Sequence, residues 1–135
     1  HHARLCFVGH GNAVKASLSV EENLAFWAAL HGTGGKVPAA LGTFGLDRLA
    51  DLPARFLSAG QRRRLTLSRL WVTDAPLWLL DEPETALDTQ AMDALRDAMA
   101  QHRDRGGIVV LATHGDDMPP NHTRLELAVA PWKGV

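Results

Sequence analysis

The stretch Leu77-Trp78-Leu79-Leu80-Asp81-Glu82-Pro83 decides the fold, because it joins a strand pattern to two adjacent carboxylates. A continuous apolar run that ends in acid is typical of a strand buried on both faces of a parallel sheet. Ligands of open α/β sheets bind outside the carboxyl ends of the strands. Asp81 is therefore a candidate for holding Mg²⁺, which prefers oxygen ligands, and Glu82 for accepting a proton from an attacking water. The alternative is a strand end followed by an acidic turn.

The stretches on either side of this strand alternate between strand and helix patterns. Short apolar runs predict strands over 4–8 and 108–112, the second one also buried, and an edge strand over 123–129. Apolar residues at helical spacing predict helices over about 20–31, 37–44, 58–72 and 89–104, with one helical turn near 47–52. This alternation predicts an α/β protein with a mainly parallel sheet.

The segment Leu57-Ser58-Ala59-Gly60-Gln61 places small residues at the start of a helix. Small side chains let a phosphate approach the exposed amides, and the helix dipole favours that anion. Ser58 adds a hydroxyl donor, and Gly60 has no Cβ in the way. An ordinary serine N-cap explains the same residues equally well.

A histidine follows the second strand pattern, in Leu111-Ala112-Thr113-His114. His114 is expected at the same sheet edge as Asp81, where it could hydrogen-bond a terminal phosphate or an attacking water. A structural role is the alternative for a single histidine.

Length and composition limit the classes of protein that remain. The chain has 135 residues, of which 46% are apolar and 21% charged, as in one globular domain. A net charge of −1 disfavours a nucleic-acid module. A single cysteine, Cys6, excludes an internal disulfide and is expected to be a buried apolar residue.

Taken in order, these segments resemble the second part of an ABC-transporter nucleotide-binding domain. Leu57–Gln61 matches the family's signature motif and Leu77–Asp81 its Walker B strand. Glu82 matches the catalytic glutamate, Ala86-Leu87-Asp88 the D-loop, and His114 the switch histidine. The resemblance implies an incomplete P-loop NTPase fold of the ABC ATPase type, with a helical subdomain inserted before the signature helix.

The resemblance also implies a division of the chain and a set of ligands. Residues from about 12 to 66 would form the helical subdomain and signature motif. Residues from about 67 to 135 would form the Walker B, D-loop and switch-histidine part of a core. ATP and Mg²⁺ are the implied cofactors. Ser58, Ala59, Gly60, Gln61 and Asp88 would contact the nucleotide, Asp81 would bind Mg²⁺ through ATP, and Glu82 and His114 would be catalytic.

A narrower resemblance is to the haem-exporter ATPases of cytochrome c maturation. It rests on Gly9-His10, Glu22-Asn23-Leu24, Ala75-Pro76-Leu77-Trp78 and an alanine at position 59, where most of the wider family has glycine. It implies ATP hydrolysis that energises haem export or handling for c-type cytochromes. The implied partners are transmembrane permease subunits and a second ATP-binding subunit in a head-to-tail dimer, at the cytoplasmic face of the bacterial inner membrane.

The chain departs from the family at its phosphate-binding loop, G-x-x-x-x-G-K-[ST]. Gly34-Gly35-Lys36 does not fit this motif, because Leu30 stands at its first glycine and Val37 follows the lysine. We interpret this segment as a loop and expect a fragment that lacks the Walker A region, with open strand edges and poor ATPase activity of its own. A non-catalytic, partner-binding remnant is the alternative, and a soluble ABC protein of DNA repair or translation fits this short chain less well.

Two further segments have open interpretations. The glutamine of the family's Q-loop would fall at Gly11, which has no side chain to reach Mg²⁺ or water, and Asn12 is a possible substitute. Arg62-Arg63-Arg64 is expected to be a solvated basic face, with help to nucleotide phosphates or an acidic partner as the alternative. Trp27, Trp71 and Trp78 are expected in the core.

Overall fold

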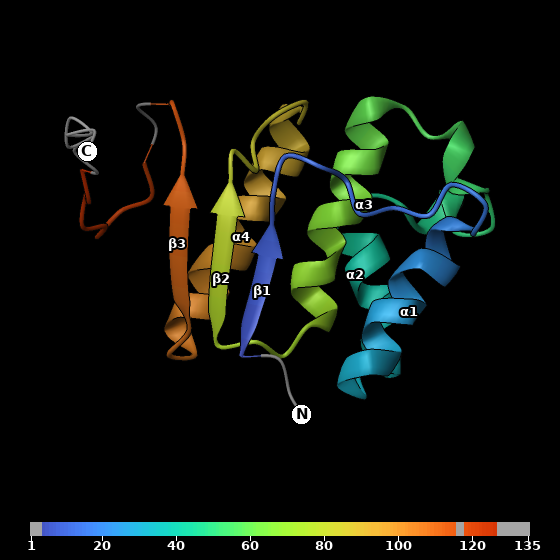
Figure 1. The fold of residues 1–135 in the computed structure, drawn as a ribbon, viewed down its shortest axis with the longest axis horizontal. Helices are drawn as coiled ribbons and strands as arrows, with labels where there is room; N and C mark the ends of the chain where they lie inside the picture. The colour runs from blue at the N-terminus through green and yellow to red at the C-terminus, as the bar shows by residue number, and fades with distance from the viewer. Residues whose placement is uncertain (1–3, 116–117, 127–135) are drawn as a thin grey trace, which may run out of the picture.

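The computed structural model describes residues 4–115 and 118–126 and contains, within them, one parallel sheet. Its strands are β1 (Leu5–Val8), β2 (Leu77–Asp81) and β3 (Ile108–Ala112), and they lie in that order across the sheet (Figure 1). The register pairs Leu5 with Leu77 and Leu77 with Ile108, so the three strands run side by side and end at one edge. The parallel α/β arrangement predicted from the sequence is confirmed.

The helices form two groups around this sheet. Helix α4 (Thr89–Asp104) lies behind the sheet, whereas α1 (Val20–His31), α2 (Val37–Thr43) and α3 (Ala59–Val72) lie together beyond β1 (Figure 1). Short 3₁₀ turns occur at Gly34–Lys36, Asp47–Leu49 and Ala54–Phe56. The segment expected as a loop thus forms a 3₁₀ turn, in which Lys36 Nζ lies 3.0 Å from Asp74 Oδ1.

Local side-chain hydrogen bonds explain where the long helices begin. Ser19 accepts from the amide of Glu22 at 3.1 Å while the Glu22 carboxylate accepts from the amide of Ser19 at 2.7 Å. Ser58 and Gln61 form the same reciprocal pair at the start of α3, at 3.2 and 2.8 Å. Such capping boxes satisfy two of the amides that the first turn of a helix leaves unbonded.

One hydrophobic cluster joins the helical group to the sheet. Leu24 of α1, Leu67 of α3 and Leu95 of α4 are all buried within it, together with Cys6 and Trp78 from the sheet. Burial raises the pKa of the Cys6 thiol, as expected for an apolar core residue. Trp27 and Trp71 are half-buried at the margin of the cluster rather than inside it, which corrects their predicted place in the core.

Among the residues that the structure describes, packing elements cover only one of the two faces of the sheet. On the other face the side chains of β1 and β3 are exposed, including Phe7 at 55%, Val110 at 51% and Ile108 at 62%, and Leu77 and Leu79 of β2 are half-buried. The prediction that the strands at 77–80 and 108–112 are buried on both faces was therefore wrong. An apolar run shows that the side chains are suited to burial, but not whether another layer of the fold covers them. The predicted strand over 123–129 is absent at residues 123–126, and its remainder lies outside the described residues.

Within residues 4–115 and 118–126, helices long and apolar enough to cross a bilayer are not found.

Candidate active site

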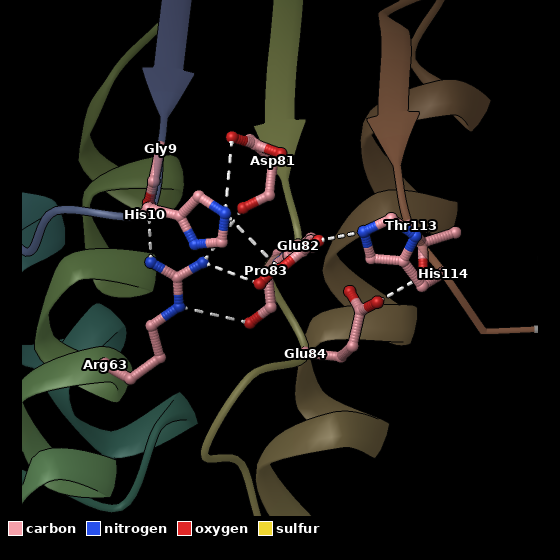
Figure 2. Close-up of polar contacts among 9 residues, drawn as sticks. All are labelled: Gly9, His10, Arg63, Asp81, Glu82, Pro83, Glu84, Thr113 and His114. Carbon is pink, nitrogen blue, oxygen red and sulfur yellow. Dashed lines mark hydrogen bonds and ion pairs between the residues drawn. The ribbon is translucent and has the colours of Figure 1, made fainter.

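Two adjacent carboxylates stand at the edge where the parallel strands end. Asp81 is the last residue of β2, and Glu82 follows it with a φ of 46°, in the left-handed region (Figure 2). This conformation costs a non-glycine residue about 1–2 kcal/mol. The Glu82 amide donates to the carbonyl of Ala112 at 2.8 Å, so the turn is tied to the end of β3.

His114 reaches the Glu82 carboxylate from the end of β3. Its Nε2 lies 2.6 Å from Glu82 Oε1, although the imidazole itself is 92% exposed. Thr113, next to it, donates its hydroxyl to the Glu84 carboxylate, so a second contact links the β3 end to the loop that follows β2. Three predicted residues, Asp81, Glu82 and His114, are thus brought together at one edge of the sheet.

His10 joins this group from the end of β1 and was not predicted as a site residue. Its Nε2 lies 3.4 Å from Glu82 Oε2 and 4.0 Å from Asp81 Oδ2 (Figure 2). Like His114, it is a histidine just past a predicted strand, and this shared position could have identified it. Asn12, the suggested substitute at the Q-loop, instead accepts a hydrogen bond from the Thr66 hydroxyl of α3 at 3.2 Å. His10, just after the end of β1, is therefore the residue of this segment that contacts the two carboxylates.

The signature segment lies against the D-loop of the same chain. A Cβ added at Gly60 would come within 2.9 Å of the carbonyl oxygen of Ala86, so only glycine fits this contact. Ala86 itself has a φ of 64°. Ser58 and Gln61 cap α3, which agrees with the alternative interpretation of Ser58 as an ordinary N-cap. Asp88 caps α4, where its carboxylate accepts a hydrogen bond from the Ala91 amide at 2.8 Å. Ser58 and Ala59 remain exposed.

Arg63 is buried at 4% exposure, which corrects the prediction of a solvated basic face at its position. Its guanidinium reaches backbone carbonyls at the ends of β1 and β2 (Figure 2). Burial lowers the pKa of the Arg63 guanidinium, and the nearby Glu84 and Asp81 carboxylates partly oppose that change. Arg62 is exposed and Arg64 half-buried. The pattern of three arginines did not reveal that the middle one points into the fold.

Gly60→Ala is expected to lower the free energy of unfolding by about 1–2 kcal/mol, because the added methyl group must displace backbone at Ala86. Gly42→Ala is the matched control, since its Cβ would meet nothing within 4 Å. In a helix this exchange alone stabilises by up to about 1 kcal/mol. Urea unfolding of both variants tests the contact, and a Gly60→Ala midpoint that rises as in Gly42→Ala would contradict it.

The parallel sheet, the carboxylates at its strand ends and the serine-capped helix beside them fit an incomplete α/β fold of the P-loop NTPase class. The sequence model described as ABC transporter matches residues 1–85, and the chain therefore belongs to the ABC transporter family. Two solved structures share the fold: an ATP-binding subunit of an ABC transporter (TM-score 0.73, 24% identity, 82% of this chain and 48% of that one), and a dimeric post-hydrolysis ATP-binding cassette with ADP and phosphate (TM-score 0.74, 22% identity, 84% and 53%).

Two curated relatives are more similar in sequence. The cytochrome c biogenesis ATP-binding export protein CcmA of Paramagnetospirillum magneticum is 52% identical over 132 residues, covering 94% of this chain and 61% of that protein. The protein of the same name from Rhodospirillum rubrum is 51% identical, covering 94% and 55%. The chain thus spans little more than half the length of these relatives.

Proposed function

We propose that the chain is part of the ATP-hydrolysing subunit of an exporter that serves cytochrome c biogenesis and handles haem. The observation that most directly supports ATP hydrolysis is the 2.6 Å contact between His114 and Glu82, beside Asp81 at the strand ends. The 52% identity to a relative named for ATP-binding export in cytochrome c biogenesis supports the biological role.

Glu82 is the proposed general base of hydrolysis. Its carboxylate takes a proton from a water whose oxygen attacks the γ-phosphorus, and the bond from that phosphorus to the bridging oxygen breaks to release ADP. His114 holds one carboxylate oxygen, which fixes the direction in which Glu82 points. Proton transfer requires a base held in reach of its substrate, so this contact is central to the role.

Asp81 is the proposed contact to Mg²⁺. Its carboxylate is 40% exposed at the strand end and offers the hard oxygen ligand that this ion prefers. When bound with ATP, Mg²⁺ would neutralise charge on the phosphate oxygens.

Ser58, Ala59, Gly60 and Gln61 are proposed to face the nucleotide of a second subunit in a head-to-tail dimer. They form the amino-terminal end of a 14-residue helix, where the dipole favours a phosphate. Asp88 is the last residue of the D-loop that packs on Gly60 and the N-cap of α4, and we propose that it contacts the nucleotide from there.

The chain is proposed to contribute two parts to the whole domain. Residues of about 12–66 would supply the helical subdomain and signature motif, and 67–135 the Walker B, D-loop and switch-histidine part of the core. Transmembrane permease subunits would dock on the segment of about 12–56, which places the protein peripherally at the cytoplasmic face of the bacterial inner membrane. A nucleic-acid partner is not proposed, given the net charge of −1.

A chimera tests this function, because the 135-residue chain alone is expected to hydrolyse ATP poorly. The region of the Paramagnetospirillum relative that aligns with this chain is exchanged for the chain itself. The chimera is then assayed for ATP hydrolysis and for restoring c-type cytochromes in a strain that lacks the relative.

The expected result is ATP hydrolysis and recovery of cytochromes that carry covalently bound haem. Hydrolysis without recovery would contradict the role in cytochrome c biogenesis. A folded chimera that binds its permease but does not hydrolyse ATP would favour the alternative, a partner-binding module without catalysis.

A further inference from the structure

Arg63 uses its whole guanidinium to bind backbone carbonyls at two strand ends. Its Nη1 donates to the Gly9 carbonyl at 2.7 Å, beyond β1. At and beyond the end of β2, its Nη2 donates to the carbonyls of Asp81 at 3.3 Å and Glu82 at 2.9 Å, and its Nε donates to that of Pro83 at 3.3 Å. One side chain from α3 therefore holds the turn that carries the catalytic carboxylate.

That turn needs to be held, because Glu82 lies in the left-handed region with a φ of 46°. A residue stays in this region only where its surroundings fix it. Three hydrogen bonds hold the backbone at Glu82: its amide donates to the Ala112 carbonyl, and its carbonyl accepts from both the Arg63 guanidinium and the Thr85 amide. Held this way, the Glu82 side chain lies between His10 and His114 (Figure 2).

Arginine is better suited than lysine to holding several backbone carbonyls at once. The guanidinium presents five donors in a rigid plane, whereas a lysine ammonium is a point charge on a flexible stem. The neighbouring arginines make different contacts: Arg62 donates to the Leu57 carbonyl at 2.9 Å and Arg64 to that of Phe44 at 3.2 Å. Both carbonyls belong to segments near α3, far in sequence from the strand ends.

We propose that Arg63 is a positioning residue, which holds the turn after β2 so that the Glu82 carboxylate points at the reacting water. The same hydrogen bonds connect the signature helix to this turn, since Arg63 lies five residues after Ser58 on α3. A shift of α3 would therefore be transmitted to the Glu82 backbone. The inference rests on the proposed function in one respect, the role of Glu82 as the base.

The test compares Arg63→Gln and Arg63→Lys with Arg62→Gln and Arg64→Gln in the chimera. The kcat for ATP hydrolysis is expected to fall by roughly 10²-fold in Arg63→Gln, as for a displaced catalytic group. The KM for ATP should change less than about twofold, because Arg63 binds backbone and no substrate. Arg63→Lys should recover part of the kcat, and the two control variants should stay close to the parent.

Amide hydrogen exchange of the same proteins supplies a readout that does not depend on catalysis. The amides of residues 81–86, apart from Pro83 which has none, should exchange faster in Arg63→Gln than in the controls, while those of α1 stay unchanged. Equal exchange, or a kcat no lower than in Arg62→Gln, would overturn the proposal. If the parent chimera hydrolyses no ATP, the proposed function fails, and the exchange of 81–86 alone still decides whether Arg63 holds the turn.

Discussion

Glu82→Gln in the chimera is expected to lower kcat for ATP hydrolysis by roughly 10²- to 10⁴-fold, the range for loss of a general base. The amide keeps the shape of the side chain but cannot accept the proton. Because Glu82 has no proposed part in holding ATP, the affinity for nucleotide should be retained. Steady-state hydrolysis and equilibrium binding of a fluorescent ATP analogue measure the two quantities separately.

Glu84→Gln is the matched control for this variant. The same exchange is made two residues further on, in a carboxylate that accepts a hydrogen bond from Thr113 and has no contact with either histidine in the described residues. Its kcat should fall far less than that of Glu82→Gln. A Glu82→Gln protein that turns over ATP at a near-parental rate would remove Glu82 from the mechanism, and with it the purpose proposed for Arg63.

The elements of the fold were predictable because their signals are local. The helix predicted over about 20–31 is confirmed as Val20–His31, and the cap pair Ser19 and Glu22 marks its start. The strand ends could be placed in the same way, since Asp81 and His114 each follow an apolar run. A parallel sheet then brings such residues to one edge whatever the distance between them in the chain.

The contacts that depend on tertiary packing were not predictable. Nothing local distinguishes Arg63 from Arg62 and Arg64; only the position of α3 beside the strand ends gives the middle arginine its carbonyl partners. The left-handed backbone of Glu82 likewise depends on hydrogen bonds to β3 and α3, in addition to the local bond that its carbonyl accepts from the Thr85 amide. Burial of the strands was overestimated for a related reason, because their apolar composition says nothing about which layers cover the sheet.

The other large effect is expected from a substitution in the signature segment, and it concerns dimerisation. Ser58→Arg is expected to prevent ATP-dependent dimerisation of the chimera, because Ser58 is exposed at the helix end proposed to meet the partner's nucleotide. The arginine side chain is much larger than that of serine, and forcing added volume into a fitted contact costs about 1–3 kcal/mol, which corresponds to a loss of roughly 10- to 10²-fold in affinity. Sedimentation of Glu82→Gln chimeras, in which ATP should persist, compares the dimers with and without Ser58→Arg.

Ser19→Arg separates loss of the interface from loss of the helix cap. Ser19 begins α1 with the same reciprocal hydrogen bonds that Ser58 makes at α3, so both substitutions remove one capping box. Each should therefore destabilise the fold by about 1 kcal/mol, and only Ser58→Arg should keep the protein monomeric with ATP. If both variants dimerise equally, Ser58 is a helix cap and nothing more, and the partner's nucleotide must be contacted by another part of the chain.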